Sequence, residues 1–295
     1  MAGQSCTLLA DRGVLEIAGE DRRAFLQGLV SNDVDKVAAD RVVHAALLTA
    51  QGKYLHDFFI AAIGDAFYLD GEAARLADLK RRLTLYKLRA KVTIAEASER
   101  HVIAVAFGDG ALGALDLPRE RGAATAVDGG LAYVDPRLVE LGARLLLPRT
   151  TGLAPLVGWG FQPVDVAVYD RLRLTLGVPD GSRDLPVEKA ILLESGFDEL
   201  NGVDWQKGCY VGQELTARTK YRALIKKRLL PVEVDGPMPP PGTPVMSGDQ
   251  EAGEMRSGRD HIGLALLRLE ALGHDKPLTA GTARLTPRKP EWAKF

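Results

Sequence analysis

Short apolar stretches, separated by polar turns that contain glycine, dominate the first half of the chain. Residues 42–49 and 54–63 are two such stretches, and Gln51-Gly52-Lys53 between them favours a tight turn, so the region is predicted to form a β-hairpin. The same pattern predicts further strands, which lie at residues 14–17, 66–69, 91–96, 101–107, 131–134 and 143–147. The first half of the chain is therefore expected to be built around β-sheets.

Helical periodicity, with apolar residues three or four positions apart, interrupts these strands. One helix is predicted to begin at residues 20–23, a second to cover 72–85 and a third to cover 164–176. The positions expected to face the core in the first two are Ala24, Phe25, Leu29, Val30, Leu76, Leu79 and Leu83. Because the strands form hairpins instead of alternating strictly with helices, the pattern predicts an α+β fold.

The composition changes near residue 236. Residues 236–242 are too rich in proline for a helix or a central strand, so they are predicted to form a connection within or near a second domain. Short apolar stretches follow at residues 262–269 and 283–286, broken by glycines and prolines. This arrangement favours a small β-barrel at the C-terminal end.

The chain carries almost no net charge. Its 295 residues suggest about two domains, and its formal net charge is −1. A near-neutral protein has no overall attraction to nucleic acid or to acidic membranes, so neither is expected as a partner. The N-terminal residues resemble neither a secretory signal nor a transit peptide, and no apolar stretch approaches the roughly 20 residues of a membrane span. We therefore expect a cytoplasmic protein.

The two cysteines, Cys6 and Cys209, limit the redox and metal chemistry. They cannot form a disulfide framework, which fits a reducing compartment. They also cannot supply the four thiolates that usually hold an iron–sulfur cluster, so a cluster would need ligands from a partner or a second subunit. The sequence has neither the histidine spacing of a metal site nor a phosphate-binding glycine loop, so no resident metal and no nucleotide are expected.

Cys209 lies in the most unusual stretch of the sequence, residues 201–218. Gly208 and Gly212 bracket it and suit a tight loop that presents a side chain. Basic neighbours would favour the thiolate and make the thiol reactive or metal-binding. A lone cysteine is also commonly a small buried hydrophobe. Both interpretations stay open for Cys209, whereas Cys6 is expected to be of the buried kind.

This stretch resembles a family signature. The segment Lys207-Gly-Cys-Tyr-Val-Gly-Gln-Glu214 is similar to the K-G-C-Y-x-G-Q-E motif of the YgfZ family and its mitochondrial iron–sulfur assembly counterpart. Blocks at residues 25–33, 47–53, 173–179 and 184–188 also resemble that family. The residues that the resemblance implies as support for the cysteine are Lys207, Gly208, Tyr210, Gly212, Gln213, Glu214 and Arg218. The run that begins at Gln213 is predicted to start a helix.

The family is similar in fold to the T-protein of the glycine cleavage system. The resemblance implies a ring of α+β domains around a central folate pocket, here over residues 1–228 with two intertwined subdomains, and a β-barrel over residues 229–295. It also implies that an aspartate and a tyrosine hold folate, and these align with Asp57 and Tyr68. The carboxylate would position the pterin ring or act as a general base. An aspartate at a strand end and a tyrosine on a half-buried sheet are the alternative interpretation.

Two positions depart from the T-protein pattern. Its folate-binding glutamate aligns with Arg144, and its arginine before an aspartate aligns with Tyr169, ahead of Asp170. Replacing an acid by a base reverses the charge presented to a ligand. Folate binding is compatible with these changes, but the aminomethyl chemistry loses support. Tyr169 and Arg173 are kept as candidate cofactor-binding residues.

The resemblance implies a tetrahydrofolate-binding accessory protein for assembly or repair of 4Fe–4S clusters in client enzymes, including radical enzymes that modify tRNA. Cys209 would be a reactive thiol, or one ligand of a transient cluster shared with a client or carrier protein, beside a pocket near Asp57. Two further hypotheses are a folate-dependent aminomethyl- or methyltransferase, and a non-catalytic interaction module in which folate is structural. The sequence does not choose among them.

Overall fold

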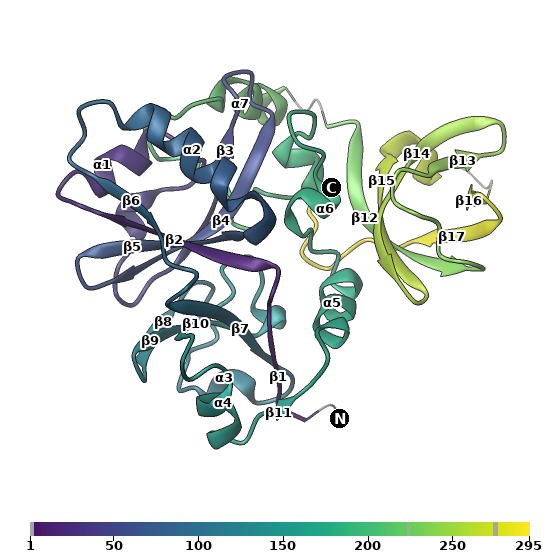
Figure 1. The fold of residues 1–295 in the computed structure, drawn as a ribbon. Helices are drawn as coiled ribbons and strands as arrows, with labels where there is room; N and C mark the ends of the chain where they lie inside the picture. The colour runs from purple at the N-terminus through teal and green to yellow at the C-terminus, as the bar shows by residue number, and fades with distance from the viewer. Residues whose placement is uncertain (1–2, 223–224, 274–276) are drawn as a thin grey trace. The chain divides into compact units, whose positions relative to one another are not determined.

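The computed structural model describes residues 3–222, 225–273 and 277–295, which form two compact units (Figure 1). Unit 1 comprises residues 1–48, 55–166 and 200–211, and unit 2 comprises residues 49–54, 167–199 and 212–295. Neither unit is a continuous piece of the chain. The predicted division into residues 1–228 and 229–295 stays a prediction.

A five-stranded sheet forms one part of unit 1, in the order β3-β4-β5-β2-β6. Its strands are β2 (Arg12–Ala18), β3 (Val43–Leu48), β4 (Tyr54–Ile63), β5 (Ala66–Glu72) and β6 (Thr93–Glu96). The predicted hairpin is confirmed, since β3 and β4 are neighbours on either side of the glycine turn. The helix α2 (Leu76–Lys87) buries Leu76, Leu79 and Leu83, as the periodicity predicts.

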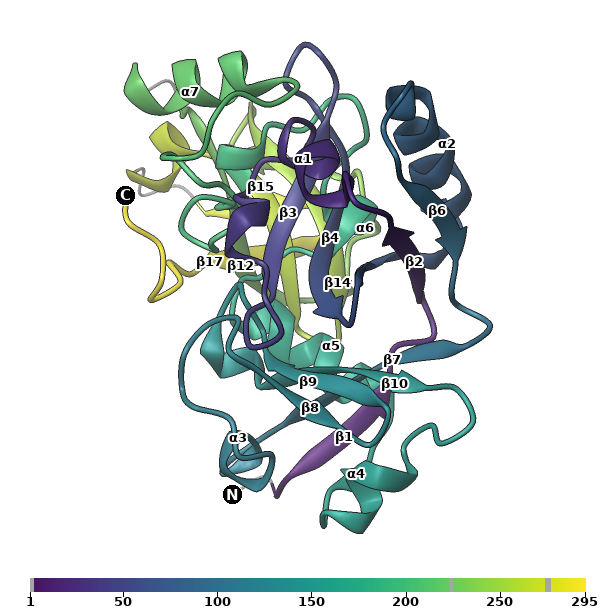
Figure 2. The same ribbon diagram turned by 90° about the vertical axis from the view of Figure 1, so that its left-hand side faces the viewer.

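A six-stranded sheet forms the other part of unit 1, in the order β11-β1-β7-β10-β9-β8. Figure 2 shows it below the five-stranded sheet, with two short helices, α3 (Ala111–Ala114) and α4 (Ala154–Gly158), at its outer side. Its strands are β1 (Ser5–Leu8), β7 (His101–Phe107), β8 (Ala124–Val127), β9 (Gly130–Val134), β10 (Ala143–Pro148) and β11 (Gln162–Pro163). Its apolar side chains form a core around Cys6, Leu145, Leu147 and Phe161.

Unit 2 contains a closed barrel in the order β12-β15-β14-β13-β16-β17. Its strands are β12 (Lys227–Asp235), β13 (Pro244–Ser247), β14 (Gln250–Arg259), β15 (Ile262–Arg268), β16 (Leu278–Ala280) and β17 (Ala283–Pro287). The predicted C-terminal barrel is therefore confirmed, and the proline-rich stretch joins two of its strands, β12 and β13. The unit also contains α5 (Val166–Thr175), α6 (Gly181–Asp184) and α7 (Gln213–Tyr221). Leu174 of α5 packs against Leu229 and Leu264 of the barrel.

Several short elements have no clear pattern in the sequence, among them β1, β8, β13, β16, α3 and α4. The helix α1 (Arg22–Gln27) is shorter than the periodicity predicts, and the prediction for Ala24 is wrong: Ala24 is exposed, whereas Leu26 is buried. Single-turn segments complete the fold; they are η1 (Val34–Lys36), η2 (Ala73–Arg75), η3 (Val139–Leu141), η4 (Leu192–Ser195) and η5 (Leu269–Gly273). Within the described residues, no helix has the length and apolar character needed to cross a bilayer.

Candidate functional site

The cysteine of the signature motif lies on an exposed loop of unit 1, which we call the thiol loop (residues 204–211). Cys209 is exposed, whereas Cys6 is fully buried in the core of the six-stranded sheet, and burial raises the pKa of the Cys6 thiol. The expectation for Cys6 is confirmed. For Cys209 the interpretation as a buried hydrophobe is excluded, because its side chain is reachable from solvent.

Lys207 ties the thiol loop to the N-terminal part of unit 1. Its ammonium donates to three backbone carbonyls, those of Gln27 at 2.8 Å, Val30 at 2.6 Å and Asn32 at 2.7 Å. The same Nζ lies 5.2 Å from the centre of the Tyr210 ring, on the other side of the cysteine. Burial lowers the pKa of Lys207 to about 8, while Asp33, Asp204 and Asp35 oppose that shift. Lys207 therefore fixes the thiol loop to the backbone of residues 27–32.

Further hydrogen bonds fix both ends of the thiol loop. The carboxylate of Asp204 accepts from the backbone N–H groups of Gln206 and Lys207, at 2.7 and 3.0 Å, and its own N–H donates to the Ser31 carbonyl. At the other end, the N–H of Val211 donates to the Gly28 carbonyl at 3.1 Å. Residues 25–33 and residues 204–211 therefore meet in space within unit 1.

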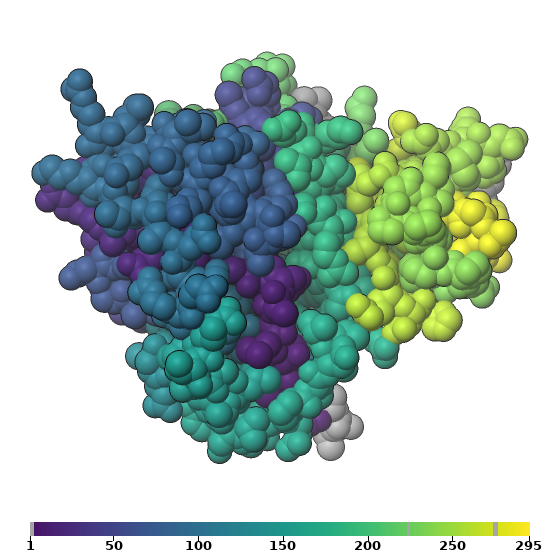
Figure 3. Space-filling view, viewed as in Figure 1, coloured from purple at the N-terminus to yellow at the C-terminus, as the bar shows by residue number. Residues whose placement is uncertain are grey.

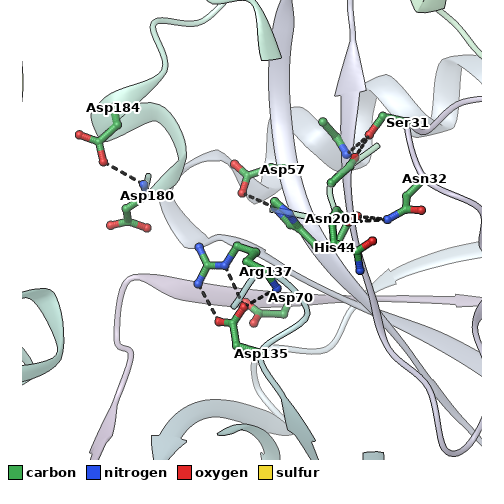
Figure 4. Close-up of polar contacts among 12 residues, drawn as sticks. Ser31, Asn32, His44, Asp57, Asp70, Asp135, Arg137, Asp180, Asp184 and Asn201 are labelled. Atoms are coloured by element: carbon green, nitrogen blue, oxygen red, sulfur yellow. Dashed lines mark hydrogen bonds and ion pairs between the residues drawn. The ribbon is translucent and has the colours of Figure 1, made fainter. Parts of the chain in front are cut away.

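The segment before the loop is held by two buried side chains, Ser31 and Asn32 (Figure 4). The hydroxyl of Ser31 donates to the Gly202 carbonyl at 2.6 Å, and the amide of Asn32 donates to the Asn201 carbonyl at 2.8 Å. The amide of Asn32 also donates to the carbonyl of His44 in β3, at 2.7 Å. The sheet therefore supports the chain that leads into the thiol loop.

The two glycines of the motif differ in conformation. Gly212 precedes α7 and has a φ of 81°, in the left-handed region where a side chain is strained, so the prediction of a glycine-dependent turn holds there. Gly208 lies outside that region, and a Cβ added to it would meet no atom within 4 Å, so the prediction is wrong for Gly208. The predicted helix after Gly212 is confirmed, and its Glu214 and Arg218 form an ion pair.

Gly52, at the turn of the hairpin, packs directly against the start of α7 within unit 2. Its φ is +78°, and a Cβ added there would lie 2.6 Å from Cβ of Leu215 and 2.7 Å from the carbonyl oxygen of Gly212. Gly52→Ala is therefore expected to lower the free energy of unfolding by about 2–4 kcal/mol, measured by denaturant titration. Gly64→Ala is the matched control, because Gly64 has a φ of +55° and open space around it. Equal losses in both variants would contradict the close contact.

Asp57, the candidate for binding folate, lies on β4 beside His44 of β3 (Figure 4). It is 6% exposed, and its Oδ2 lies 3.1 Å from Nε2 of His44. Burial lowers the pKa of His44 against the opposing effect of Asp57, so the imidazole is neutral and donates its Nε2–H to the carboxylate. The carboxylate is thus held in a fixed orientation within unit 1.

A buried cluster of charged side chains lies next to this pair and connects the two sheets of unit 1. Asp70 of β5 accepts from Arg12 at 2.7 Å and from Arg144 of β10 at 2.6 Å, and Asp135 accepts from Arg137 at 2.8 Å. Burial alone would raise the pKa of Asp70 and of Asp135, but the arginines lower each below its usual value. Both carboxylates are therefore ionised and act as counter-ions.

Arg144, which aligns with the folate-binding glutamate of the T-protein, is engaged in contacts inside unit 1. Its guanidinium is bound to Asp70, lies 3.9 Å from Asp135 and stacks 4.2 Å from the centre of the Phe59 ring. The positive charge that the sequence places there is thus neutralised inside the protein and is not offered to a ligand. Sequence reasoning missed Asp70 and Asp135, although a charged residue within an apolar strand signals a buried partner.

Tyr68 does not lie beside Asp57. It pairs with Ala61 across β4 and β5, and Asp57 precedes Ala61 by four residues (61 − 57), which corresponds to about 13 Å along the strand. The Tyr68 ring contacts His101 instead, with ring centres 5.1 Å apart, and burial raises the pKa of its hydroxyl. A ligand would have to be long to touch both residues, and their predicted role in folate binding stays a prediction.

The other two cofactor-binding candidates lie on α5, in unit 2. Tyr169 is buried. Arg173 donates to Asp170 at 2.7 Å, to Asp184 at 2.9 Å and to the hydroxyl of Ser257 in β14 at 2.9 Å, so it connects α5 and α6 to the barrel. These hydrogen bonds show that Arg173 stabilises unit 2. Its role in binding a cofactor stays a prediction.

Unit 1 has a cavity of about 500 Å³ beside the segment that leads into the thiol loop. Asn32, Asn201, Lys36 and Arg41 are part of its lining, whereas Cys209 and Asp57 are not. Two of the lining cations already have counter-ions, because Lys36 is paired with Asp204 and Arg41 with Glu120. Across the described part of the chain, no group of three or more His, Cys, Asp or Glu side chains is arranged to hold a metal ion.

Comparison with known proteins finds a matching family model and similar proteins from mouse and human. A protein-family model for the CAF17 C-terminal β-barrel domain matches residues 226–295. The mouse (Mus musculus) protein named mitochondrial iron–sulfur cluster assembly factor IBA57 is 33% identical, over 98% of this chain and 85% of its own length. The human (Homo sapiens) protein of the same name is 34% identical, over 99% and 86%.

A solved structure establishes the fold. The glycine cleavage system aminomethyltransferase T from Bartonella henselae superposes with a TM-score of 0.80 over 99% of this chain and 87% of its own, at 13% identity. The predicted T-protein-like α+β fold with a C-terminal barrel is therefore confirmed. The central folate pocket stays a prediction.

The names of the mouse and human relatives also correct one expectation. Both are described as mitochondrial, which contradicts the predicted cytoplasmic location. The expectation rested on N-terminal residues that resemble neither a secretory signal nor a transit peptide, and on the lack of a long apolar stretch. The lack of a long apolar stretch argues only against a membrane span, and the two cysteines fit any reducing compartment.

Proposed function

Because this chain belongs to the family of iron–sulfur cluster assembly factor IBA57, we propose that it assists the assembly or repair of 4Fe–4S clusters in client enzymes. The membership rests on 33% and 34% identity over nearly the whole chain. Radical enzymes that modify tRNA are the proposed clients, and client or carrier proteins are the proposed partners. The cluster is cargo in this proposal and not a resident group.

The exposed thiol of Cys209 carries the proposal. A thiol that binds iron must be reachable and must lose its proton on binding. Cys209 meets the first condition, and the only other cysteine, Cys6, is buried. One chain therefore offers a single reachable thiol, and the remaining thiolates of a cluster must come from the partner. Such sharing suits a protein that hands a cluster on and does not keep it.

The hydrogen bonds that fix the thiol loop support the proposed role of Cys209 as a cluster ligand. Lys207 and Asp204 hold the backbone on the N-terminal side of Cys209, and Val211 holds the other side. A ligand on a fixed loop binds with less loss of conformational freedom than a ligand on a mobile one. The sulfur is thus presented to an incoming protein in a defined position.

We include tetrahydrofolate, or a one-carbon derivative of it, in the proposal on narrower grounds. Asp57 fits a bound pterin, because it is a carboxylate held in a fixed orientation by the neutral His44. Arg144 does not fit the role of the glutamate it replaces, since Asp70 already neutralises it. Bound folate would supply a one-carbon carrier; the chain's own contribution would be to bind and orient it through Asp57.

The test is complementation in cells that lack the protein. Cys209→Ser is expected to lower the activity of a 4Fe–4S tRNA-modifying enzyme by about tenfold or more relative to wild type. Cys6→Ala is the matched control, because it removes the buried cysteine and is expected to restore the activity. A cluster-independent enzyme serves as the second control. Equal rescue by Cys209→Ser and wild type would refute the proposed role of the thiol.

The alternative as a folate-dependent aminomethyltransferase is favoured by the shared fold and by Asp57. Methylene transfer to tetrahydrofolate that is lost in Asp57→Asn but kept in Cys209→Ser would favour the transferase. Binding of tetrahydrofolate, measured by calorimetry, is expected to weaken in Asp57→Asn under either function. Absence of any binding by the wild type would remove folate from the proposal and leave the role of Cys209 intact.

A further inference from the structure

The last turn of α2 and the residue after it place three large apolar side chains in solvent within four residues. Leu85 is 66% exposed, Tyr86 43% and Leu88 88%. Single exposed leucines are common on protein surfaces, but a contiguous exposed group marks an interaction site. The buried residues of α2 are Leu76, Leu79 and Leu83, so the three exposed side chains are not part of the core of unit 1. We call residues 85–89 the α2 patch.

The backbone of the α2 patch is strained at its most exposed residue. Leu88 follows the last residue of α2 with φ 43° and ψ −109°. Helices commonly end with glycine in a conformation of positive φ, because a side chain there clashes with the backbone. Leu88 therefore occupies a glycine-type position and projects its side chain into water. A strained residue that is 88% exposed points to a role outside the fold.

Positive charge surrounds these apolar side chains. Residues 79–91 contain six cations, Lys80, Arg81, Arg82, Lys87, Arg89 and Lys91, and no acidic residue, in a chain whose net charge is −1. Asp78, Glu96 and Glu20 form ion pairs with four of them. Among the residues that the structure describes, Lys87 and Arg89, which flank Leu88, have no carboxylate within ion-pair distance. The α2 patch thus joins an apolar centre to two unneutralised cations.

We infer that the α2 patch is a docking surface for a protein partner that presents an apolar depression rimmed by Asp and Glu. Aromatic and arginine side chains are enriched in such interfaces, and complementary charge steers the encounter. A lipid surface fits less well, since membrane-bound helices present a continuous apolar face and that face of α2 is buried. The α2 patch lies on the surface of unit 1 that is visible in Figure 3. This inference goes beyond the proposed function, because it uses residues outside the thiol loop.

The test uses the full chain with p-benzoyl-L-phenylalanine in place of Tyr86, irradiated in living cells. The expected result is an adduct with one protein, whose cross-linked peptide carries Asp or Glu beside apolar residues. Its yield is expected to fall about tenfold in a Lys87→Glu/Arg89→Glu background. Lys substitutions at the acidic residues of that peptide are expected to restore it. Val157, 49% exposed on α4, is the control position for the photoreactive group.

Leu88→Gly separates docking from folding. It removes the exposed side chain and relieves the strained backbone, so the melting temperature is expected to stay the same or rise while the adduct yield falls. Any of the following would overturn the inference: yields equal to the Val157 position, an adduct with a second copy of this chain, or an adduct unaffected by charge reversal. Patch-dependent binding to phosphatidylserine vesicles but not to phosphatidylcholine vesicles, without a protein adduct, would assign the patch to membranes and overturn it as well.

Discussion

Asp70→Asn is expected to lower the free energy of unfolding by about 3–5 kcal/mol. Asp70 is the shared counter-ion of Arg12 and Arg144, and its pairs with both are almost completely buried. Asparagine keeps the shape of the side chain but removes its charge, which leaves two buried guanidinium groups without their nearest carboxylate. Burial of a charge without a partner is among the most costly changes in a protein interior. Urea titration followed by circular dichroism measures the loss.

Asp65→Asn is the matched control for this prediction. Asp65 lies at the turn between β4 and β5 of the same sheet, and its fully exposed carboxylate reaches Arg22 only at 3.9 Å. An exposed pair of this kind contributes about 0–1 kcal/mol. If Asp70→Asn costs no more than Asp65→Asn, the cluster around Asp70 does not hold the two sheets together.

The same pair of variants has a defined pH dependence. The arginines hold the pKa of Asp70 below its usual value in the folded state. The unfolded chain therefore binds a proton first as the pH falls, and the stability that Asp70 contributes is present above about pH 4 and is lost below it. The stability difference between wild type and Asp70→Asn is expected to shrink between pH 7 and pH 3. A constant difference over that range would show that the charge of Asp70 is not what stabilises the fold.

The parts of the fold that the sequence predicts are those governed by neighbours along the chain. The leucines of α2 recur at helical spacing, and the hairpin of β3 and β4 follows from a glycine between two apolar stretches. The start of α7 follows from a glycine before a polar helix. In each case the decisive interactions lie within a few residues, so the local pattern is sufficient.

The buried charge cluster shows where that reasoning fails. Asp70 lies 58 residues from Arg12 and 74 residues from Arg144 in the sequence, and no periodicity connects them. The available signal is a charged residue inside an otherwise apolar strand, which requires a partner but does not identify it. From the residue type alone, Arg144 is expected to present a positive charge to a ligand in place of a negative one. Its ion pair with Asp70 neutralises that charge.

The thiol loop shows a second limit. The motif predicts that Lys207 supports Cys209. The resemblance also includes residues 25–33, but nothing in the sequence predicts that Lys207 contacts those residues. The acceptors of Lys207 are backbone carbonyls. Carbonyls are the same in every residue, so a side chain that recognises them leaves no signature in the segment it binds.

Lys207→Met is expected to lower the free energy of unfolding by about 2–4 kcal/mol and to loosen the thiol loop. Methionine keeps the length and apolar stem of the lysine, but it leaves three carbonyls without their donor, and each unsatisfied buried acceptor costs about 1–3 kcal/mol before water or relaxation compensates. Because Cys209 lies two residues away, alkylation of its thiol by iodoacetamide is expected to change in rate. Lys36→Met is the matched control, since Lys36 pairs with Asp204 of the same loop from an exposed position. Its cost is expected to stay below about 1 kcal/mol.

The pH dependence tests whether burial disfavours the charged form of Lys207 more than the three carbonyls stabilise it. Burial lowers its pKa to about 8 in the folded state, whereas a free lysine has a pKa of about 10.4. Between these values the unfolded chain binds more protons than the folded chain, so the stability that depends on Lys207 rises with pH. The deficit of Lys207→Met relative to wild type is therefore expected to be larger at pH 9.5 than at pH 7. A deficit that shrinks over this interval would mean that the three carbonyls hold the charged form more firmly than burial disfavours it.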